Sequence, residues 1–206
     1  MSRILVTAVV VAGILAGAVA HRYIRESDSD VATLERATLY QAPRPLPEFA
    51  LVDQRGAAFD PARLRGRWTF LFFGFVNCPD ICPTTLATLA AVRRTLADLP
   101  AGERPGVALV SVDPARDSPS VLARYVAHFD PAFTGVTGAP DRLEALARDL
   151  GVAVFVSAAD ADGDYAVDHS AAIFLVDPRA RVVALFNTPH DAATIARDYR
   201  RIVSAG

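Results

Sequence analysis

The sequence predicts an α/β domain in which helices cover both faces of a sheet with a parallel core. Two unbroken apolar runs, Trp68 to Val76 and Val107 to Val112, are typical of strands that are buried on both faces. Segments with helical spacing of apolar residues follow these runs, and this alternation favours parallel strands joined by helices. The length of 206 residues suits one such domain and a tail.

The composition excludes several other classes of protein. The formal net charge of −2 gives no support for a nucleic-acid-binding protein, which needs a basic surface. A hydrophobic fraction of 52% is too high for a disordered chain, and two cysteines are too few for a disulfide-rich scaffold.

The N-terminus predicts export from the cytosol. Ile4 to Ala20 contains no charged residue, and as a helix it would span about 26 Å, close to the roughly 30 Å of a bilayer core. We therefore interpret residues 1–25 as a transmembrane anchor that leaves the soluble domain on the periplasmic or extracytoplasmic side. The alternative is a signal segment cleaved near Ala20, because Ala18-Val19-Ala20 has the small-x-small form of a cleavage site.

Residues 26–46 are predicted to be a linker, and residues 47–206 the folded domain. The segment begins with the acidic, polar run Glu26 to Asp30 and ends with spaced prolines, a composition typical of a solvated tether that stiffens towards a domain.

The domain begins with a predicted hairpin and a central strand. Asp53 to Gly56 has the composition of a turn between two short strands. Trp68 to Val76 is the first buried strand, and the recurrence of leucines at three or four positions predicts a helix from Pro83 to Leu99. Val107 to Val112 is the second buried strand.

The second half continues the alternation and closes with a hairpin and a helix. Ser118 is a good N-cap with Pro119 at the first helical position, and Gly151 stops the third helix. The predicted elements are a helix at 118–129, a helix at 141–150, a strand at 152–156, strands at 171–176 and 181–186 around the turn 177–180, and a helix at 191–203. This pattern alone leaves thioredoxin-like, flavodoxin-like and other doubly wound strand orders open.

Cys78 and Cys82 are the residues most indicative of function. They follow a buried strand directly and lie at the start of a helix, where ligand sites of open α/β sheets are found. Residues four apart face the same side of a helical turn, so the pair could form a disulfide or bind one metal ion. The helix N-terminus is expected to lower the thiol pKa. A purely structural disulfide is the weaker interpretation, because so short a loop gains little stability from closure.

Two thiolates need a third donor to hold a metal ion. Of the four histidines, His21 flanks the apolar segment, His128 is late in a helix, and His190 precedes the last helix. His169 immediately precedes a predicted strand and is the candidate ligand. Two thiols and an imidazole suit copper or zinc, and the lack of a fourth ligand favours copper, as Cu(I) or Cu(II).

Asp113 ends the neighbouring strand and is a candidate for tuning or orienting the thiol site without binding the metal itself. The alternative is that Asp113 and Asp117 only cap a turn or the helix that follows. The sequence contains no phosphate-binding glycine-rich loop and no G-x-S-x-G motif.

Three blocks together give the chain a specific resemblance. Cys78-Pro79-Asp80-Ile81-Cys82-Pro83, Ser111-Val112-Asp113-Pro114 and Asp168-His169-Ser170 occur in the order and approximate spacing of the SCO/SenC family. The similarity spans roughly Leu46 to Val203. Ala180, where this family commonly has glycine in the last hairpin turn, and Asn77 are departures that remove no ligand.

The resemblance implies a thioredoxin-like, membrane-tethered copper chaperone. It implies that Cys78, Cys82 and His169 bind one copper ion with Asp113 nearby. It also implies copper delivery to the dinuclear copper centre of cytochrome c oxidase subunit II, with a separate copper donor protein upstream. The alternative is a thiol-disulfide oxidoreductase in which Cys78 and Cys82 reduce that centre or other exported proteins. Three residues between the cysteines, instead of the usual two, favour the chaperone.

Overall fold

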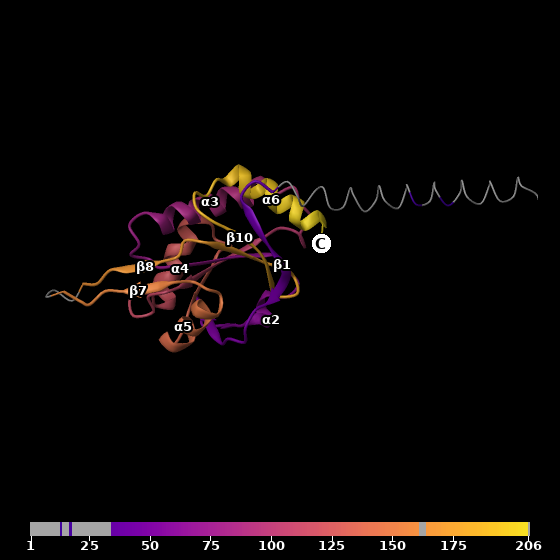
Figure 1. Ribbon diagram of the computed structural model, residues 1–206. Helices are drawn as coiled ribbons and strands as arrows, with labels where there is room; N and C mark the ends of the chain where they lie inside the picture. Colours follow the sequence, from indigo (N-terminus) through magenta and orange to yellow (C-terminus); the bar gives the residue numbers. More distant parts are fainter. Residues whose placement is uncertain (1–12, 14–16, 18–33, 161–163, 206) are drawn as a thin grey trace, which may run out of the picture. The chain divides into compact units, whose positions relative to one another are not determined.

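The computed structural model describes residues 13, 17, 34–160 and 164–205. An eight-stranded mixed sheet runs in the order β1-β10-β9-β4-β5-β6-β2-β3. Figure 1 shows β1 next to β10. The centre of the sheet is the parallel set β4 (Thr69–Gly74), β5 (Gly106–Ser111) and β6 (Thr134–Thr137). The antiparallel hairpin of β9 (Ile173–Val176) and β10 (Arg181–Phe186) adds to the other side of β4. The predicted α/β class with a parallel core is confirmed.

The central strand β4 is buried on both faces, as its apolar run predicts. Phe70 to Phe73 are fully buried, and each buried phenylalanine contributes about 1.5–3 kcal/mol of transfer free energy. Because side chains alternate along a strand, Leu71 and Phe73 face one layer and Phe70 and Phe72 the other.

Helices cover both faces of the sheet. Leu71 and Phe73 belong to the same core cluster as Leu143 and Leu146 of α5 (Pro140–Asp149). On the opposite face, α4 (Pro119–Phe129) packs on β6 and on α3 (Ile81–Thr95). Gly135 of β6 allows this close approach, since a Cβ there would lie 2.9 Å from the Leu122 Cβ.

The helix ends follow the local sequence signals. The Ser118 hydroxyl accepts a hydrogen bond from the Val121 N–H at the start of α4, with Pro119 at the first position. Gly151, which follows the C-cap residue Leu150 of α5, has a φ of +74°, as expected of a glycine that ends a helix in the left-handed conformation.

Part of the predicted linker is a strand. Within 26–46, β1 (Ala37–Pro45) pairs antiparallel with β10, with a shift of register between Leu39 and Arg44. Its prolines, which we interpreted as part of a solvated tether, are compatible with this position because β1 is an edge strand and need not donate hydrogen bonds on its outer side. The folded region therefore begins about ten residues earlier than predicted.

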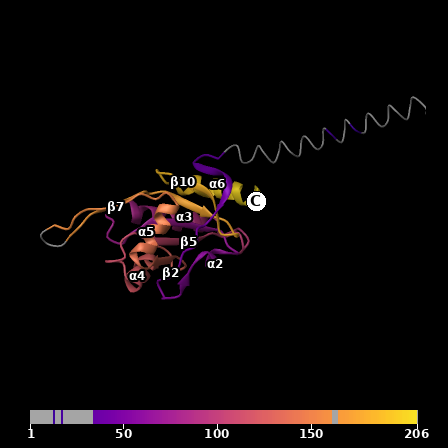
Figure 2. The ribbon, with the colours of Figure 1, turned by 60° about the horizontal axis from the view of Figure 1, so that its bottom comes forward.

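Three other elements lack a prediction from the sequence: α2 (Pro61–Leu64), β6 and β8 (Val167–His169). The first strand pair is β2 (Leu51–Asp53) with β3 (Ala58–Phe59), as expected. Strands β7 (Val154–Val156) and β8 form a separate two-stranded hairpin. Figures 1 and 2 both show this hairpin extending away from the large sheet.

The described residues fall into two units, one within 36–196 and the other including residues 34 and 35 with 197–205, and helix α6 (Ala192–Ala205) has residues in both. In the smaller unit, the Glu35 N–H donates to the Asp198 carboxylate at 2.9 Å, and the Glu35 carboxylate pairs with Arg197 at 2.8 Å. The predicted anchor or signal segment, apart from Gly13 and Gly17, lies outside the described residues. Among the residues that are described, no helix is long and apolar enough to cross a bilayer.

Candidate metal centre

Cys78 and Cys82 lie where β4 gives way to α3. Cys78 is in the connecting loop and Cys82 in the first turn of the helix, and both are free thiols. The Cys82 backbone N–H donates to the Cys78 Sγ at 3.4 Å, so one sulfur already occupies the hydrogen-bonding position at the helix N-terminus. Cys82 is fully buried and Cys78 is 8% exposed.

Gly74 sets how closely Cys82 approaches the sheet. A Cβ at this position would lie 2.9 Å from the Cys82 Sγ and 3.0 Å from both Leu109 and Phe72. The last residue of the central strand therefore needs to lack a side chain for the thiol to lie where it does.

The pKa of the Cys82 thiol is raised, which corrects the expectation that the helix N-terminus lowers it. Burial is the main cause, followed by the hydrogen bond with Cys78. The helix dipole favours a thiolate, but removing the sulfur from water opposes the charge more strongly. In the metal-free protein Cys82 is consequently a neutral thiol at pH 7, and a metal cation has to displace its proton.

His169 comes to the same place from the end of β8. Its Nε2 lies 3.3 Å from the Cys82 Sγ, although 87 positions separate the two residues. Its Nδ1 lies 3.0 Å from the Ser170 carbonyl oxygen, and as an N–H donor there it leaves Nε2 with a free lone pair. Burial lowers the pKa of His169 and so favours the neutral imidazole that metal binding requires. Phe72 and Phe75 pack edge-on against the ring.

The three side chains form a compact donor set. One ligand atom each from Cys78, Cys82 and His169 lie within 4.8 Å of one another. Two sulfurs and one imidazole nitrogen are soft donors, and the group suits a three-coordinate Cu(I) better than zinc, whose structural sites use four protein ligands. The fold thus brings together all three ligand residues that the sequence predicts.

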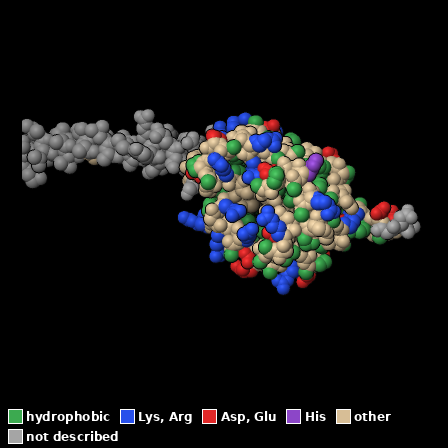
Figure 3. Space-filling model, turned by 180° about the vertical axis from the view of Figure 1, so that it is seen from behind, with side chains coloured by type: hydrophobic (Ala, Val, Ile, Leu, Met, Phe, Trp, Pro, Cys, Tyr) green, Lys and Arg blue, Asp and Glu red, His purple; other side chains and the backbone are tan. Residues whose placement is uncertain are grey.

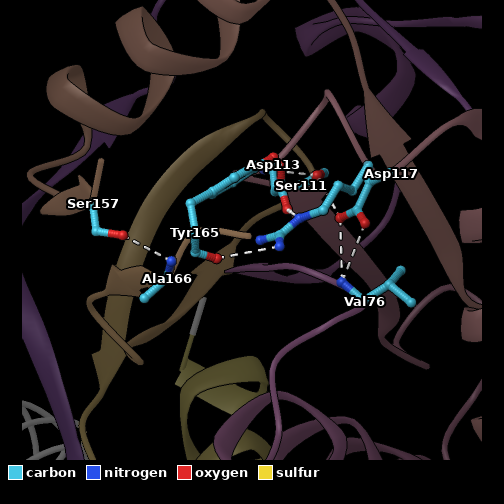
Figure 4. Close-up of polar contacts among 8 residues, drawn as sticks. Val76, Ser111, Asp113, Asp117, Ser157, Tyr165 and Ala166 are labelled. Atoms are coloured by element: carbon cyan, nitrogen blue, oxygen red, sulfur yellow. Dashed lines mark hydrogen bonds and ion pairs between the residues drawn. The ribbon is translucent and has the colours of Figure 1, made fainter. Parts of the chain in front are cut away.

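Asp117 supports the cysteine loop, a contact that the sequence did not reveal. Its carboxylate accepts a hydrogen bond from the Val76 N–H at 3.2 Å and from the Ser111 hydroxyl at 2.7 Å (Figure 4). Asp117 is 1% exposed, and this burial raises its pKa to about 6. Asp117 therefore does more than cap a turn beside Asp113, because it holds the chain two residues before Cys78.

Asp113 contacts the hairpin that contains His169 rather than either thiol. Its carboxylate accepts a hydrogen bond from the Tyr165 hydroxyl at 2.6 Å and pairs with Arg116. The Arg116 guanidinium also stacks on the Tyr165 ring at 3.8 Å and donates to the Tyr165 carbonyl at 3.2 Å. Figure 4 shows Tyr165 and Asp113 turned towards each other. Asp113 can therefore act on the metal site through the position of the hairpin.

The other histidines do not join the cluster of described ligand groups. His128 is exposed on α4, and the His190 Nε2 donates to the Ala171 carbonyl at 2.8 Å. His21 lies outside the described residues. Neither Arg116 nor Tyr165 carries a sequence signal that separates it from other surface residues.

The family model described as SCO1/SenC matches residues 38–204. The chain belongs to the SCO1/SenC family. Similar proteins include the mitochondrial SCO2 homologue of Bos taurus, which is 36% identical over 204 residues, or 99% of this chain and 76% of the relative. The mitochondrial SCO2 homologue of Homo sapiens is 36% identical over 158 residues, covering 77% of this chain and 59% of the relative.

Two solved SCO structures extend the comparison to three dimensions. Arabidopsis thaliana ScoI with copper bound has a TM-score of 0.71 at 33% identity, and covers 77% of this chain and 98% of its own. Yeast Sco1 with copper bound has a TM-score of 0.69 at 34% identity, and covers 79% of this chain and 88% of its own. These matches confirm the thioredoxin-like fold expected from the SCO/SenC resemblance.

Proposed function

We propose that this SCO1/SenC protein binds one copper ion through Cys78, Cys82 and His169 and delivers it during cytochrome c oxidase assembly. The observation that carries the proposal is the 3.3 Å approach of the His169 Nε2 to the Cys82 Sγ inside a buried dithiol site. The copper-bound Arabidopsis and yeast relatives support the choice of metal. The receiving site is the dinuclear copper centre of oxidase subunit II, and a separate donor protein supplies the ion.

The protonation of the ligand side chains controls how the site binds and releases the ion. The Ser170 carbonyl fixes the tautomer of His169, and the buried environment keeps its imidazole neutral. When both cysteines bind copper as thiolates, their two thiol protons leave, and they return when copper is released. Cu(II) in place of two protons leaves the charge of the site unchanged, whereas Cu(I) gives the site one negative charge.

The chain is proposed to act at a membrane. Residues 1–25 would anchor it with the copper domain on the extracytoplasmic side, or be removed near Ala20. Intact mass measurement of the mature chain distinguishes the two, since cleavage removes about twenty residues. Protease treatment of intact cells then shows whether the domain is on the outer side of that membrane.

Copper binding is tested with the full chain, reduced and loaded with Cu(II). We expect a thiolate-to-copper charge-transfer band, and we expect His169→Ala to lose that band and most of the copper. His128→Ala is the matched control, because His128 is exposed on α4 and outside the ligand set. Retention of both band and metal by His169→Ala would show that the three-ligand site is wrong.

Delivery is tested by mixing the copper-loaded chain with the copper-free subunit II domain. We expect copper to leave the chain and the absorption of the dinuclear centre to grow, with no growth from Cys78→Ser or Cys82→Ser. The oxidoreductase alternative is motivated by the two free thiols at the start of α3, Cys78 in the preceding loop and Cys82 in the first turn. It predicts that the metal-free dithiol reduces an oxidised subunit II domain, and that this activity survives His169→Ala.

A further inference from the structure

One edge of the β7–β8 hairpin has no strand partner in the described part of the chain. The Ser170 N–H donates to the Ala153 carbonyl at 3.0 Å, and the Ser157 N–H to the Ala166 carbonyl at 2.9 Å. In an antiparallel pair the hydrogen-bonding residues alternate. The backbone N–H and C=O groups of Val154 and Val156 therefore point away from β8 and form an open edge.

A groove of about 390 Å³ lies beside this open edge. Its apolar walls include Val154 and Val156 of β7, Leu143 of α5 and Pro114 from the loop after β5. The charged residues Glu144 and Arg148 of α5 also line it, and no residue of β8 does. The groove therefore adjoins β7, whose unused hydrogen-bonding groups point away from β8. Its apolar residues can accept alternate side chains of an extended segment that pairs with β7.

Among the described residues, the large hydrophobic side chains that are exposed to solvent are both in β7 of this hairpin. Val156 is 51% exposed beside the groove, and Phe155, on the opposite face of β7, is 67% exposed. Soluble proteins protect exposed apolar edge strands with charge, a bulge or a covering partner. Strand β7 itself contains no charged residue, so no charge protects its edge.

The charge of the hairpin indicates which kind of partner fits. Asp160, Asp164 and Asp168 are exposed, and the sequence from 152 to 169 contains no lysine or arginine. Figure 3 shows acidic and hydrophobic side chains along the visible part of the hairpin. A second copy paired through β7 would bring two acidic hairpins together, and an anionic lipid surface would repel them. A basic polypeptide segment has the complementary charge.

The open edge adjoins the metal centre. Val154 is directly opposite His169 in the β7–β8 register, and neighbouring strands lie about 4.8 Å apart. We propose that the groove along β7 binds an extended, basic polypeptide segment with alternating apolar side chains, which belongs to the protein that exchanges copper with this chain. The inference rests on the proposed function for the identity of that protein, but not for the chemistry of the segment.

The chemistry is tested with a synthetic probe that does not involve copper. An octapeptide of alternating valine and arginine is titrated into the full chain, labelled with ¹⁵N in detergent micelles. We expect the amide signals of Val154 and Val156 to shift and their hydrogen exchange to slow. The matching peptide with glutamate in place of arginine should bind at least tenfold more weakly. Equal binding of both peptides, or shifts confined to other segments, would overturn the proposal.

Variants distinguish the edge from the rest of the hairpin. Val156→Pro removes an outward N–H without removing a bond to β8, and should weaken peptide binding at least tenfold. Phe155→Ser is the matched control, since Phe155 lies on the face away from the groove, and should change binding less than threefold. Unchanged binding by Val156→Pro would contradict strand pairing. Concentration-dependent dimerisation, or shifts of Val154 and Val156 on adding anionic vesicles alone, would assign the edge to a second copy or to lipid instead.

The same variants separate this proposal from the copper function. With the copper-free subunit II domain as probe, Val156→Pro should keep its copper band but transfer copper at least tenfold more slowly. Normal transfer by this variant would refute the docking edge while the chaperone function stands. Absence of transfer by the unmodified chain would refute delivery to subunit II. The peptide experiment would still show whether the groove along β7 binds a basic segment.

Discussion

Substitution of Gly74 by alanine should disturb both the stability of the domain and its metal site. The new Cβ would lie 2.9 Å from the Cys82 Sγ, whereas apolar heavy atoms pack best at about 3.5–4.0 Å. The sulfur must therefore move by roughly 0.6–1.1 Å, or the strand and helix must separate. Gly74 is outside the left-handed region, so the effect comes from crowding and not from backbone strain.

The expected cost of Gly74→Ala is about 1–3 kcal/mol of unfolding free energy, the range for overpacked cores. Displacement of a ligand atom should also lower copper affinity by about 10–100-fold, as loss of the groups that orient a ligand does. Urea denaturation of the metal-free protein gives the first quantity, and competition with a Cu(I) chelator gives the second.

Gly135→Ala is the matched control for Gly74→Ala. Its Cβ would also approach another atom to 2.9 Å, but that atom is the Leu122 Cβ, away from the thiols. We expect a similar loss of stability with copper affinity unchanged within threefold. If Gly74→Ala keeps wild-type affinity, or if both variants lose affinity equally, the argument that Gly74 positions Cys82 is refuted.

Three further predictions follow from single contacts. Burial raises the pKa of Asp117 to about 6 in the folded protein, against about 3.9 in the unfolded chain, so the unfolding free energy should fall by about 2–3 kcal/mol as pH rises from 4 to 7. Asp117→Asn should remove this pH dependence when the metal-free protein is denatured at a series of pH values. Identical pH profiles for the two proteins would contradict the prediction. Tyr165→Phe removes the 2.6 Å hydrogen bond to Asp113, and should lower the unfolding free energy by about 1 kcal/mol and the copper affinity several-fold. Tyr40→Phe is the control. Wild-type copper affinity of Tyr165→Phe would show that the contact does not position His169. Ala180→Gly relieves a φ of +59° and should stabilise by up to about 1 kcal/mol in thermal melts, whereas a loss above 1 kcal/mol would refute strain at this turn.

The sequence predicted the parts of the fold whose physics is local. The buried strands β4 and β5, the Ser118 cap and the Gly151 stop each follow from a run or a motif of a few residues. Strand β1 was missed because its partner residues in β10 lie 136–149 positions away, and its prolines are tolerated only because it lies at an edge. Strand β6 is short and contains Gly135, so it has no apolar run to recognise.

The same distinction between local and tertiary features applies to the metal site. The thiol pair follows from four-residue spacing at a helix start, but only the SCO/SenC resemblance favoured His169 strongly over the other histidines. The pKa of Cys82 was predicted with the wrong sign, because burial depends on Gly74, Phe72 and the packing of α3, which a local motif does not report. The contacts of Asp117 with Val76 and of Asp113 with Tyr165 are likewise products of the tertiary structure.

The neutral, buried thiol of Cys82 also affects how long the metal-free protein stays reduced under oxidising conditions. Disulfide exchange proceeds through thiolate attack, so a thiol with a raised pKa reacts slowly with external disulfides. Even if Cys78 first forms a mixed disulfide, closure onto Cys82 requires the Cys82 thiolate. The burial that excludes water from the site therefore acts as a kinetic delay, during which the reduced chain can meet copper before its two sulfurs bond to each other.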